Sequence, residues 1–228
     1  MNQHLHDYFI YFNPKEAVSG DFYWASKLNN GNFCIVAADS TGHSVPDAIM
    51  SILNIACLKE AVTKEITSPD LLLNETRRLV IENLKNDGSK EGGKDGMDCC
   101  LLNFDFVNKK LDFALANNPM WIVRKDELKV YAPDKMPVGR HDRQDTSFTK
   151  QSVELQKGDM VYILTDGHAD QFGGEKGKKY KYAPFKNQVT EIASLPTSEQ
   201  KKILESQFEK WKGSLEQVDD VCIIGVRV

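Results

Sequence analysis

The feature that most constrains the fold is a β-hairpin with a carboxylate at each of its open ends. Apolar strand patterns over residues 22–28 and 32–38 flank an Asn-Asn-Gly turn at 29–31, and Asn-Gly supplies the positive φ that tight hairpin turns require. Asp21 precedes the first strand and Asp39 follows the second. Because a hairpin brings these ends to one edge of the sheet, we expect Asp21 and Asp39 to lie close together.

Two more acidic corners follow the same pattern later in the chain. Asp166 comes after the apolar run 160–164, and Asp219-Asp220 opens the final apolar run 221–228. Taken singly, each of these residues is more often a turn former than a metal ligand, so spacing alone leaves both interpretations open. Taken together, carboxylates at the ends of several strands indicate one divalent-metal site.

The donor chemistry of such a site favours hard cations. Carboxylate, carbonyl and water oxygens suit Mg²⁺ or Mn²⁺ rather than Zn²⁺, and Mg²⁺ retains several waters, so four or five aspartates are enough for two ions. Two ions about 3.5–4 Å apart share a water, lower its pKa from about 15.7 towards neutrality and neutralise phosphoryl oxygens. The site therefore predicts phosphoester hydrolysis by a metal-bridging hydroxide, without a Ser, Cys or His nucleophile.

The order of predicted elements is strands, two helices, many strands, two helices and a final strand. The first helix has Ser44 as its N-cap and Asp47 three residues later, as in a capping box, and extends to about residue 64. Tight turns imply antiparallel sheets, and helix pairs between groups of strands imply helices on the outer faces. We expect an α+β fold, an αββα sandwich of two mainly antiparallel sheets packed face to face.

The other predicted elements are a strand at 8–12, a helix at 68–85, strands at 97–106, 110–115, 120–124, 128–131, 147–155 and 160–164, and helices at 184–194 and 198–212. Residues 86–96 and 134–145 are expected to be connections. The Gly- and Lys-rich segment 169–182 is expected to be a surface flap, either solvated or in contact with a phosphoprotein. Without a repeat or an internal linker, residues 8–228 are expected to form a single catalytic domain after a frayed N-terminus at 1–7.

Composition argues against several classes of function. The formal net charge is −4 and no Lys/Arg run alternates with aromatic residues, which gives no reason to expect nucleic acid. Five cysteines without Cys-x-x-Cys spacing indicate free thiols in a reducing compartment. No apolar run approaches the length that spans a bilayer. We expect a cytoplasmic protein, or the cytoplasmic domain of a larger sensor protein, without membrane insertion by this segment.

Seven motifs resemble, in the same order, those of the SpoIIE-type serine/threonine phosphatases, the bacterial branch of the metal-dependent, protein phosphatase 2C-like family. The resemblance extends over residues 8–228. The motifs are Ser19–Trp24, Ala38–Pro46, Asp95–Asp98, Ala116–Pro119, Asp134–Gly139, Thr165–Gly167 with Asp170–Gly174, and Asp219–Val221.

The resemblance implies a set of metal-binding residues. Asp39 resembles the aspartate that bridges both ions, and the Ser40 carbonyl takes the place of a backbone ligand. Asp170 resembles a residue that holds a weaker third ion in parts of the family. In chain order, the implied metal ligands are Asp21, Asp39, Ser40, Asp166, Asp170 and Asp219, of which Asp21, Asp39, Asp166 and Asp219 are the implied catalytic residues.

The resemblance also implies a function. It implies a Mn²⁺- or Mg²⁺-dependent protein phosphatase acting on phosphoserine or phosphothreonine, with two ions, in bacterial signalling or sigma-factor partner switching. Its partners would be a phosphorylated protein substrate, such as an anti-sigma-factor antagonist, and a sensor domain or regulator. The alternatives are a catalytically weak phosphoprotein-binding module of the same fold and a hydrolase of small phosphorylated metabolites.

The chain departs from the family pattern near the predicted site. Ser44 and Asp47 stand where the family usually has Gly, and residues 8–21 contain no arginine to bind phosphate. His43 and His168 flank the carboxylates; each could donate a proton to the leaving group, and we expect a hydrogen-bonded or solvated role instead. Regulation is expected to act on the helix at 44–57 and on the flap.

Overall fold

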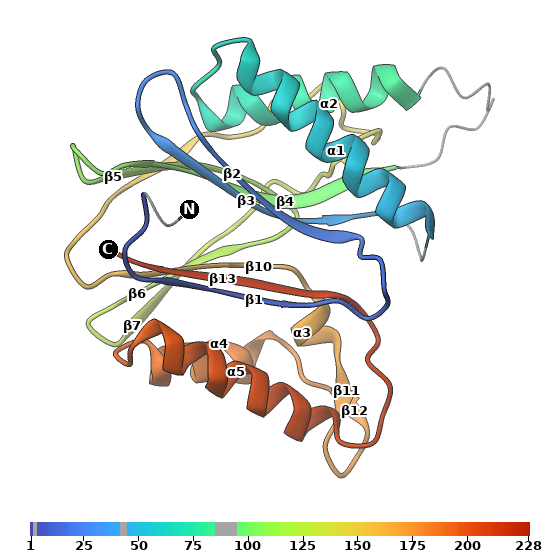
Figure 1. Cartoon of the computed structure of the whole chain (residues 1–228), viewed down its shortest axis with the longest axis vertical. Coiled ribbons are helices and arrows are strands. Elements are labelled where there is room, and N and C mark those ends of the chain that lie inside the picture. The colour runs from blue at the N-terminus through green and yellow to red at the C-terminus, as the bar shows by residue number, and fades with distance from the viewer. Residues whose placement is uncertain (2–3, 42–44, 85–94) are drawn as a thin grey trace.

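The computed structural model describes residues 1, 4–41, 45–84 and 95–228, and shows two antiparallel sheets packed between two layers of helices (Figure 1). The predicted αββα sandwich is confirmed. Within the described residues, none of the helices is long and apolar enough to cross a membrane.

The first sheet has five strands, and its order joins the two ends of the chain. The strands, in spatial order, are β1 (Tyr8–Asn13), β13 (Val221–Arg227), β10 (Met160–Leu164), β6 (Met120–Arg124) and β7 (Glu127–Tyr131). Each neighbouring pair is antiparallel. The first strand of the chain therefore lies beside the last.

The second sheet contains the predicted hairpin at one edge. Its main strands, in spatial order, are β2 (Asp21–Lys27), β3 (Phe33–Ser40), β4 (Gly96–Asp105), β5 (Lys110–Ala116) and β9 (Gln151–Glu154). The short strand β8 (Val138–Gly139) pairs with the beginning of β4. The expected connection at 134–145 thus contains a strand, and the strand expected at 147–155 is shorter than predicted.

The helices cover the outer faces of the two sheets (Figure 1). The first pair, α1 (Val45–Thr63) and α2 (Pro69–Leu84), lies on the second sheet; the other pair, α4 (Tyr182–Ile192) and α5 (Thr197–Lys212), lies on the first. The expected flap at 169–182 contains regular structure, namely the end of the single turn α3 (Gly167–Asp170) and a small hairpin of β11 (Phe172–Gly173) and β12 (Lys178–Lys179). The expected loop at 86–96 lies mostly outside the described residues.

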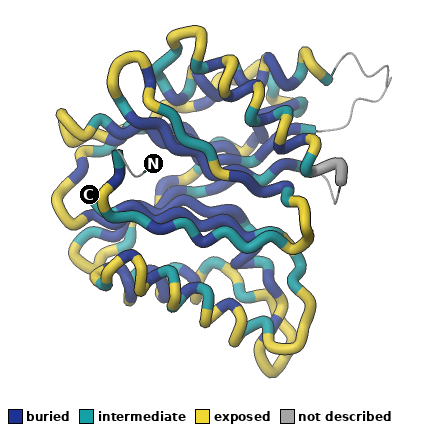
Figure 2. The backbone as a smooth tube through the Cα atoms, in the orientation of Figure 1, coloured by how far each residue is buried: buried dark blue, intermediate teal, exposed yellow. Residues whose placement is uncertain are grey.

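The alternation of side chains along β3 explains why the sandwich has three apolar layers. Ile35 and Ala37 face the cluster between the sheets, whereas Cys34, Val36 and Ala38 face α1 and α2. Because β3 is buried on both faces, its sequence is a continuous apolar run. Figure 2 shows the buried strands in the middle of the molecule and the exposed positions on the outer helices and turns.

Leu102→Ala tests the contribution of the inter-sheet layer. Leu102 is 1% exposed in the cluster between the sheets, so truncation leaves a cavity there, and we expect a loss of about 2–5 kcal/mol in the free energy of unfolding. Urea denaturation followed by circular dichroism measures this loss. Val107→Ala, at a position 91% exposed, is the control and should change stability by less than about 0.5 kcal/mol. Equal effects would contradict the assignment of the core.

Candidate metal centre

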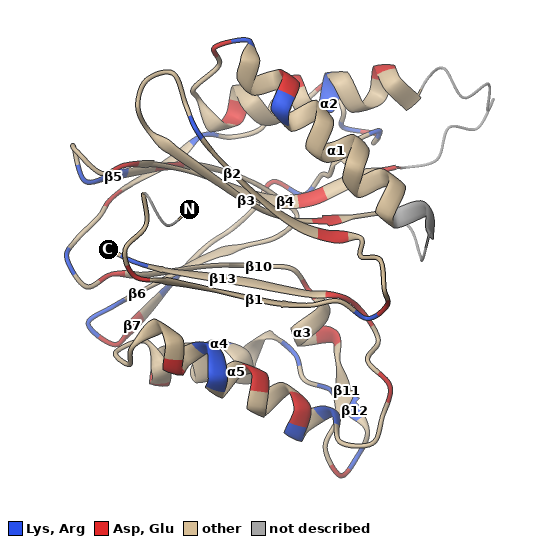
Figure 3. Ribbon diagram, in the orientation of Figure 1, with Lys and Arg blue, Asp and Glu red and all other residues tan. Residues whose placement is uncertain are grey.

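Three strands of the second sheet bring carboxylates into a row at one edge. Asp21 begins β2 and stands directly opposite Asp39 on β3, as the hairpin pattern predicted. Asp98 on β4 stands opposite Asp39 on the other side. Figure 3 shows acidic residues at this end of the strands and at the facing end of the first sheet.

The first sheet supplies the other predicted carboxylates. Asp166 follows β10 at the start of α3, and Asp219 lies two residues before β13. The two sheets are connected at this end of their strands, where the Thr165 hydroxyl donates a hydrogen bond to Asp21 Oδ2 at 2.6 Å. Four aspartates that are up to 198 residues apart in the chain are therefore brought to the same end of the sandwich.

Burial and mutual repulsion raise the pKa values of these carboxyl groups. Burial is the largest cause for Asp39, followed by the charges of Asp21, Asp166, Asp219 and Asp98, and its pKa rises to about 9. The pKa of Asp166 rises to about 6, again mainly through burial and then through Asp219.

Asp21, which is 3% exposed, also has a pKa well above its usual range. Burial is the main cause, and neighbouring carboxylates add to it, while the hydrogen bond from Thr165 lowers the pKa. Since each aspartate penalises ionisation of the others, a cation bound among them would favour their ionised forms.

The donor set fits divalent cations that prefer oxygen. Among the described residues, no group of three or more His, Cys, Asp or Glu side chains already stands in a coordination geometry. Mg²⁺ and Mn²⁺ sites need few direct carboxylates, because carbonyl oxygens and water complete the shell. The fit therefore rests on the converging oxygen donors and on the repulsion among them, and the individual ligand roles stay predictions.

Helix α1 holds the ends of both hairpin strands through polar side chains inside an otherwise apolar sequence. The Ser51 hydroxyl donates to the Gly20 carbonyl at 2.8 Å, and Asn54 Nδ2 donates to Ser40 Oγ at 3.0 Å. Asn54 is fully buried. Sequence analysis missed this function, although a Ser and an Asn at buried positions of an apolar helix were visible signals.

Asp170 occupies a different environment from the other predicted ligands. It ends α3, and its carboxylate forms an ion pair with Lys179 of β12 at 2.8 Å. The negative charge of Asp170 also raises the pKa of Asp166. Binding of a third cation at Asp170 would therefore compete with a lysine of the flap.

Two acidic residues acquire functions that the sequence did not assign. Asp98 lies beside Asp39, burial raises its pKa, and Asn117 Nδ2 donates to its Oδ1 at 2.8 Å. Asp220 accepts hydrogen bonds from the backbone amides of Lys15, Gly20 and Asp21, and its charge also raises the pKa of Asp21. The Asp95–Asp98 motif was noticed, but the β3–β4 register that places Asp98 is a long-range pairing.

The expected hydrogen-bonded or solvated role of His168 is wrong. The imidazole is 2% exposed and stacks on the ring of Phe185, with the two ring centroids 4.1 Å apart. Neither ring nitrogen has a hydrogen-bond partner within the described residues. Burial lowers its pKa to about 3, which keeps the ring neutral at physiological pH. His43 and Ser44 lie outside the described residues, and so does the Asp47 side chain.

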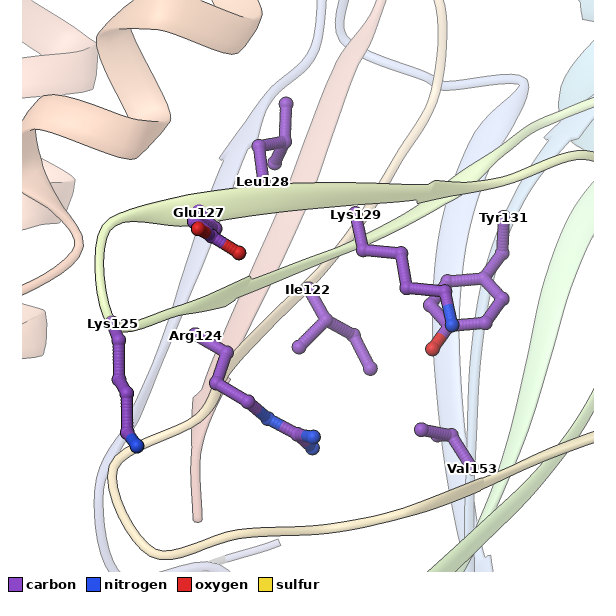
Figure 4. A pocket seen from close by; sticks show the side chains of 8 residues that line it. All are labelled: Ile122, Arg124, Lys125, Glu127, Leu128, Lys129, Tyr131 and Val153. Carbon is purple, nitrogen blue, oxygen red and sulfur yellow. The ribbon is translucent and has the colours of Figure 1, made fainter.

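A pocket of about 520 Å³ beside the β6–β7 hairpin is separate from this site (Figure 4). Its lining includes Arg124, which pairs with Asp159 at 2.6 Å, and Tyr131, whose ring lies 4.8 Å from Lys129 Nζ. Arg124 lies near the first residue of β10, Met160, whereas Asp166 follows the last residue of that strand. The pocket and the acidic cluster are therefore at opposite ends of β10. The pocket contains none of the predicted metal ligands.

Comparison with known families decides which family this arrangement represents. The family model described as "Stage II sporulation protein E (SpoIIE)" matches residues 29–228. The chain belongs to the SpoIIE family. The sequence resemblance to that family is thereby confirmed.

A curated relative is the phosphoserine phosphatase RsbP of Bacillus subtilis (strain 168). It is 20% identical over 220 residues, which are 96% of this chain and 51% of RsbP, so this SpoIIE-family chain spans about half the length of that relative.

Two solved structures share the fold. The SiaA-PP2C domain of Pseudomonas aeruginosa matches with a TM-score of 0.88 and 26% identity, over 97% of this chain and 85% of that one. The PP2C phosphatase domain of SpoIIE from Bacillus subtilis, solved with a fragment of its regulatory domain, matches with a TM-score of 0.77 and 17% identity, over 97% and 63%.

The raised pKa values predict how the stability of the metal-free protein depends on pH. Above about pH 4 the folded state keeps protons that the unfolded state releases, on Asp166 up to about pH 6 and on Asp39 up to about pH 9. The stability that these protons contribute is fully present at low pH and is lost as the pH rises through the folded pKa values. Thermal unfolding in EDTA should show a falling midpoint from about pH 5 to about pH 9.

Asp39→Asn should flatten this dependence, because it removes the group with the pKa of about 9 and the repulsion that it exerts on its neighbours. Saturating Mn²⁺ should also flatten it in the unmodified protein. A midpoint that rises with pH in EDTA, or an unchanged slope in Asp39→Asn, would contradict the repulsion described above.

Proposed function

We propose that this chain is a metal-dependent protein serine/threonine phosphatase. The observation that carries the proposal is the convergence of Asp21 and Asp39 from one sheet with Asp166 and Asp219 near the facing end of the other. The SpoIIE family membership and the named activity of the relative RsbP support it.

In this proposal the carboxylates of Asp21, Asp39, Asp166 and Asp219, with the Ser40 carbonyl, hold two Mn²⁺ or Mg²⁺ ions. Such ions, when bound, lower the pKa of a coordinated water and neutralise phosphoryl oxygens. The chain provides rigid placement: Asp21 and Asp39 occupy paired positions on two strands, and α1 fixes the ends of both. Burial of the carboxylates strengthens their attraction for cations, because water screens them less.

The proposed substrate is a phosphoserine or phosphothreonine in a protein, such as an anti-sigma-factor antagonist in a cytoplasmic partner-switching pathway. Basic groups near the cluster support an anionic substrate. Lys135 and His141 lie close enough to Asp98 to oppose the rise in its pKa, and they belong to the segment around β8. Lys135 therefore adds positive charge beside Asp98, in a chain whose residues 8–21 contain no arginine.

Asp39→Asn tests the catalytic proposal. The unmodified protein should hydrolyse an aryl phosphate only with Mn²⁺ or Mg²⁺, and EDTA should abolish turnover. The variant loses a carboxylate from the centre of the cluster, and we expect kcat/KM to fall at least about 100-fold. Asp105→Asn, at the last residue of β4 and so at the far end of that strand from Asp98, is the matched control and should retain activity. EDTA-resistant turnover would contradict the proposal.

Comparison of substrates tests whether the chain acts on proteins. Contacts remote from the phosphate contribute to transition-state binding, so a phosphoserine peptide should exceed free phosphoserine in kcat/KM by at least about tenfold. A malachite-green assay of released phosphate measures both. A preference for the free amino acid would favour a metabolite hydrolase, and Mn²⁺ binding without turnover of any substrate would favour the binding module.

A further inference from the structure

Asp21 is held in place by residues that precede and follow strands of the opposite sheet. Thr165 is 1% exposed, and its hydroxyl lies 2.6 Å from Asp21 Oδ2. The same hydroxyl accepts a hydrogen bond from the Cys222 amide at 3.0 Å, and its distance to the Cys222 carbonyl is 3.4 Å. A hydroxyl has one proton to donate, and the contact with Asp21 is much shorter than the one with the Cys222 carbonyl, so Thr165 donates to Asp21 Oδ2.

Asp220 holds the backbone that leads to the same residue. Its Oδ1 accepts from the Lys15 amide at 2.7 Å, and its Oδ2 accepts from the Gly20 amide at 2.8 Å and the Asp21 amide at 3.4 Å. The carboxylate therefore closes the loop between β1 and β2 at the residue where β2 begins. Because three backbone amides donate to this one carboxylate, the backbone at Asp21 is fixed, and with it the direction in which the Asp21 side chain points.

Gly167 shows how closely the two holding residues are packed together. A Cβ at Gly167 would lie 1.9 Å from the Asp220 carbonyl oxygen, so the start of α3 touches the segment that precedes β13. The Thr165 amide also donates to the Cys222 carbonyl at 2.9 Å. Thr165 and Asp220 thus belong to one rigid unit, and Asp21 is attached to it through both its side chain and its backbone.

We propose that Thr165 and Asp220 are positioning residues that fix the Asp21 carboxylate for cation binding, with Asp220 acting on the backbone and Thr165 on the side chain. This inference rests on the proposed function, because it assumes that Asp21 binds a cation. Both adjacent aspartates add negative charge near Asp21, and Asp220 in addition orders the loop through its contacts with backbone amides. Residues that orient a ligand in this way typically contribute 10–100-fold to metal affinity, as an order of magnitude.

Calorimetric titration of the full chain with Mn²⁺ tests the function of Thr165. Thr165→Val keeps the shape and removes the hydroxyl, and it should weaken Mn²⁺ binding by about 10–100-fold. Thr165→Ser restores the hydroxyl and should bind within about threefold of the unmodified protein. Thr76→Val is the matched control, because Thr76 is also buried and its hydroxyl donates to the Leu72 carbonyl within α2. Circular dichroism checks that each variant is folded.

Asp220→Asn tests the loop contact independently. The amide keeps one acceptor oxygen and loses the other, so Mn²⁺ binding should weaken about tenfold or more. Titration at low and high salt separates ordering from charge, since a loss caused by the missing charge alone shrinks under screening. Asp105→Asn is the control, because Asp105 accepts the Asn108 amide in a distant turn.

The outcomes distinguish this inference from the proposed function. An unmodified chain that binds no Mn²⁺ would overturn both. If the unmodified chain binds Mn²⁺ and either Thr165→Val or Asp220→Asn binds equally well, the inference is wrong for that residue while the proposed function stands. A loss in Thr76→Val as large as in Thr165→Val would show a general effect on stability and would also overturn the positioning function. If Thr165→Val does not fold, Asp220→Asn decides the test.

Discussion

The repulsion among carboxylates at one end of the sandwich is the interaction on which the rest of the structure depends. Asp21 and Asp39 lie opposite each other on paired strands, and burial prevents water from screening their charges. Such an arrangement is unfavourable by itself, so the surrounding chain must enforce it. The register of β2 and β3, the polar side chains of α1 and the contacts of Thr165 and Asp220 all serve this purpose.

The parts of the fold that local patterns encode could be predicted from the sequence. The Asn-Gly turn and the two apolar runs gave the β2–β3 hairpin and placed Asp21 beside Asp39. Strand β8 was missed because two residues paired with a distant strand leave no periodic pattern. The register of β3 and β4, which brings Asp98 to the cluster, depends on chain segments more than fifty residues apart.

The nature of individual side-chain environments was harder to predict. His168 follows a predicted metal ligand in the sequence, which suggested polar surroundings, yet it packs among Phe185, Tyr180 and Phe208 beneath α3. The backbone contacts of Asp220 were equally hidden, since the amides of Lys15 and Gly20 that donate to its carboxylate lie 205 and 200 residues earlier in the chain. In both cases the deciding contact comes from a distant part of the chain.

The pairing of β1 with β13 has a consequence for how the protein matures. These strands come from opposite ends of the described chain, and the residues that contact Asp21, Thr165 and Asp220, are synthesised much later than Asp21 itself. During synthesis on the ribosome, the hairpin that carries Asp21 and Asp39 emerges long before either contact exists. The contacts that hold Asp21 therefore form only after β10 and the segment before β13 have been synthesised, so the acidic cluster is completed together with the pairing of β13, late in biogenesis.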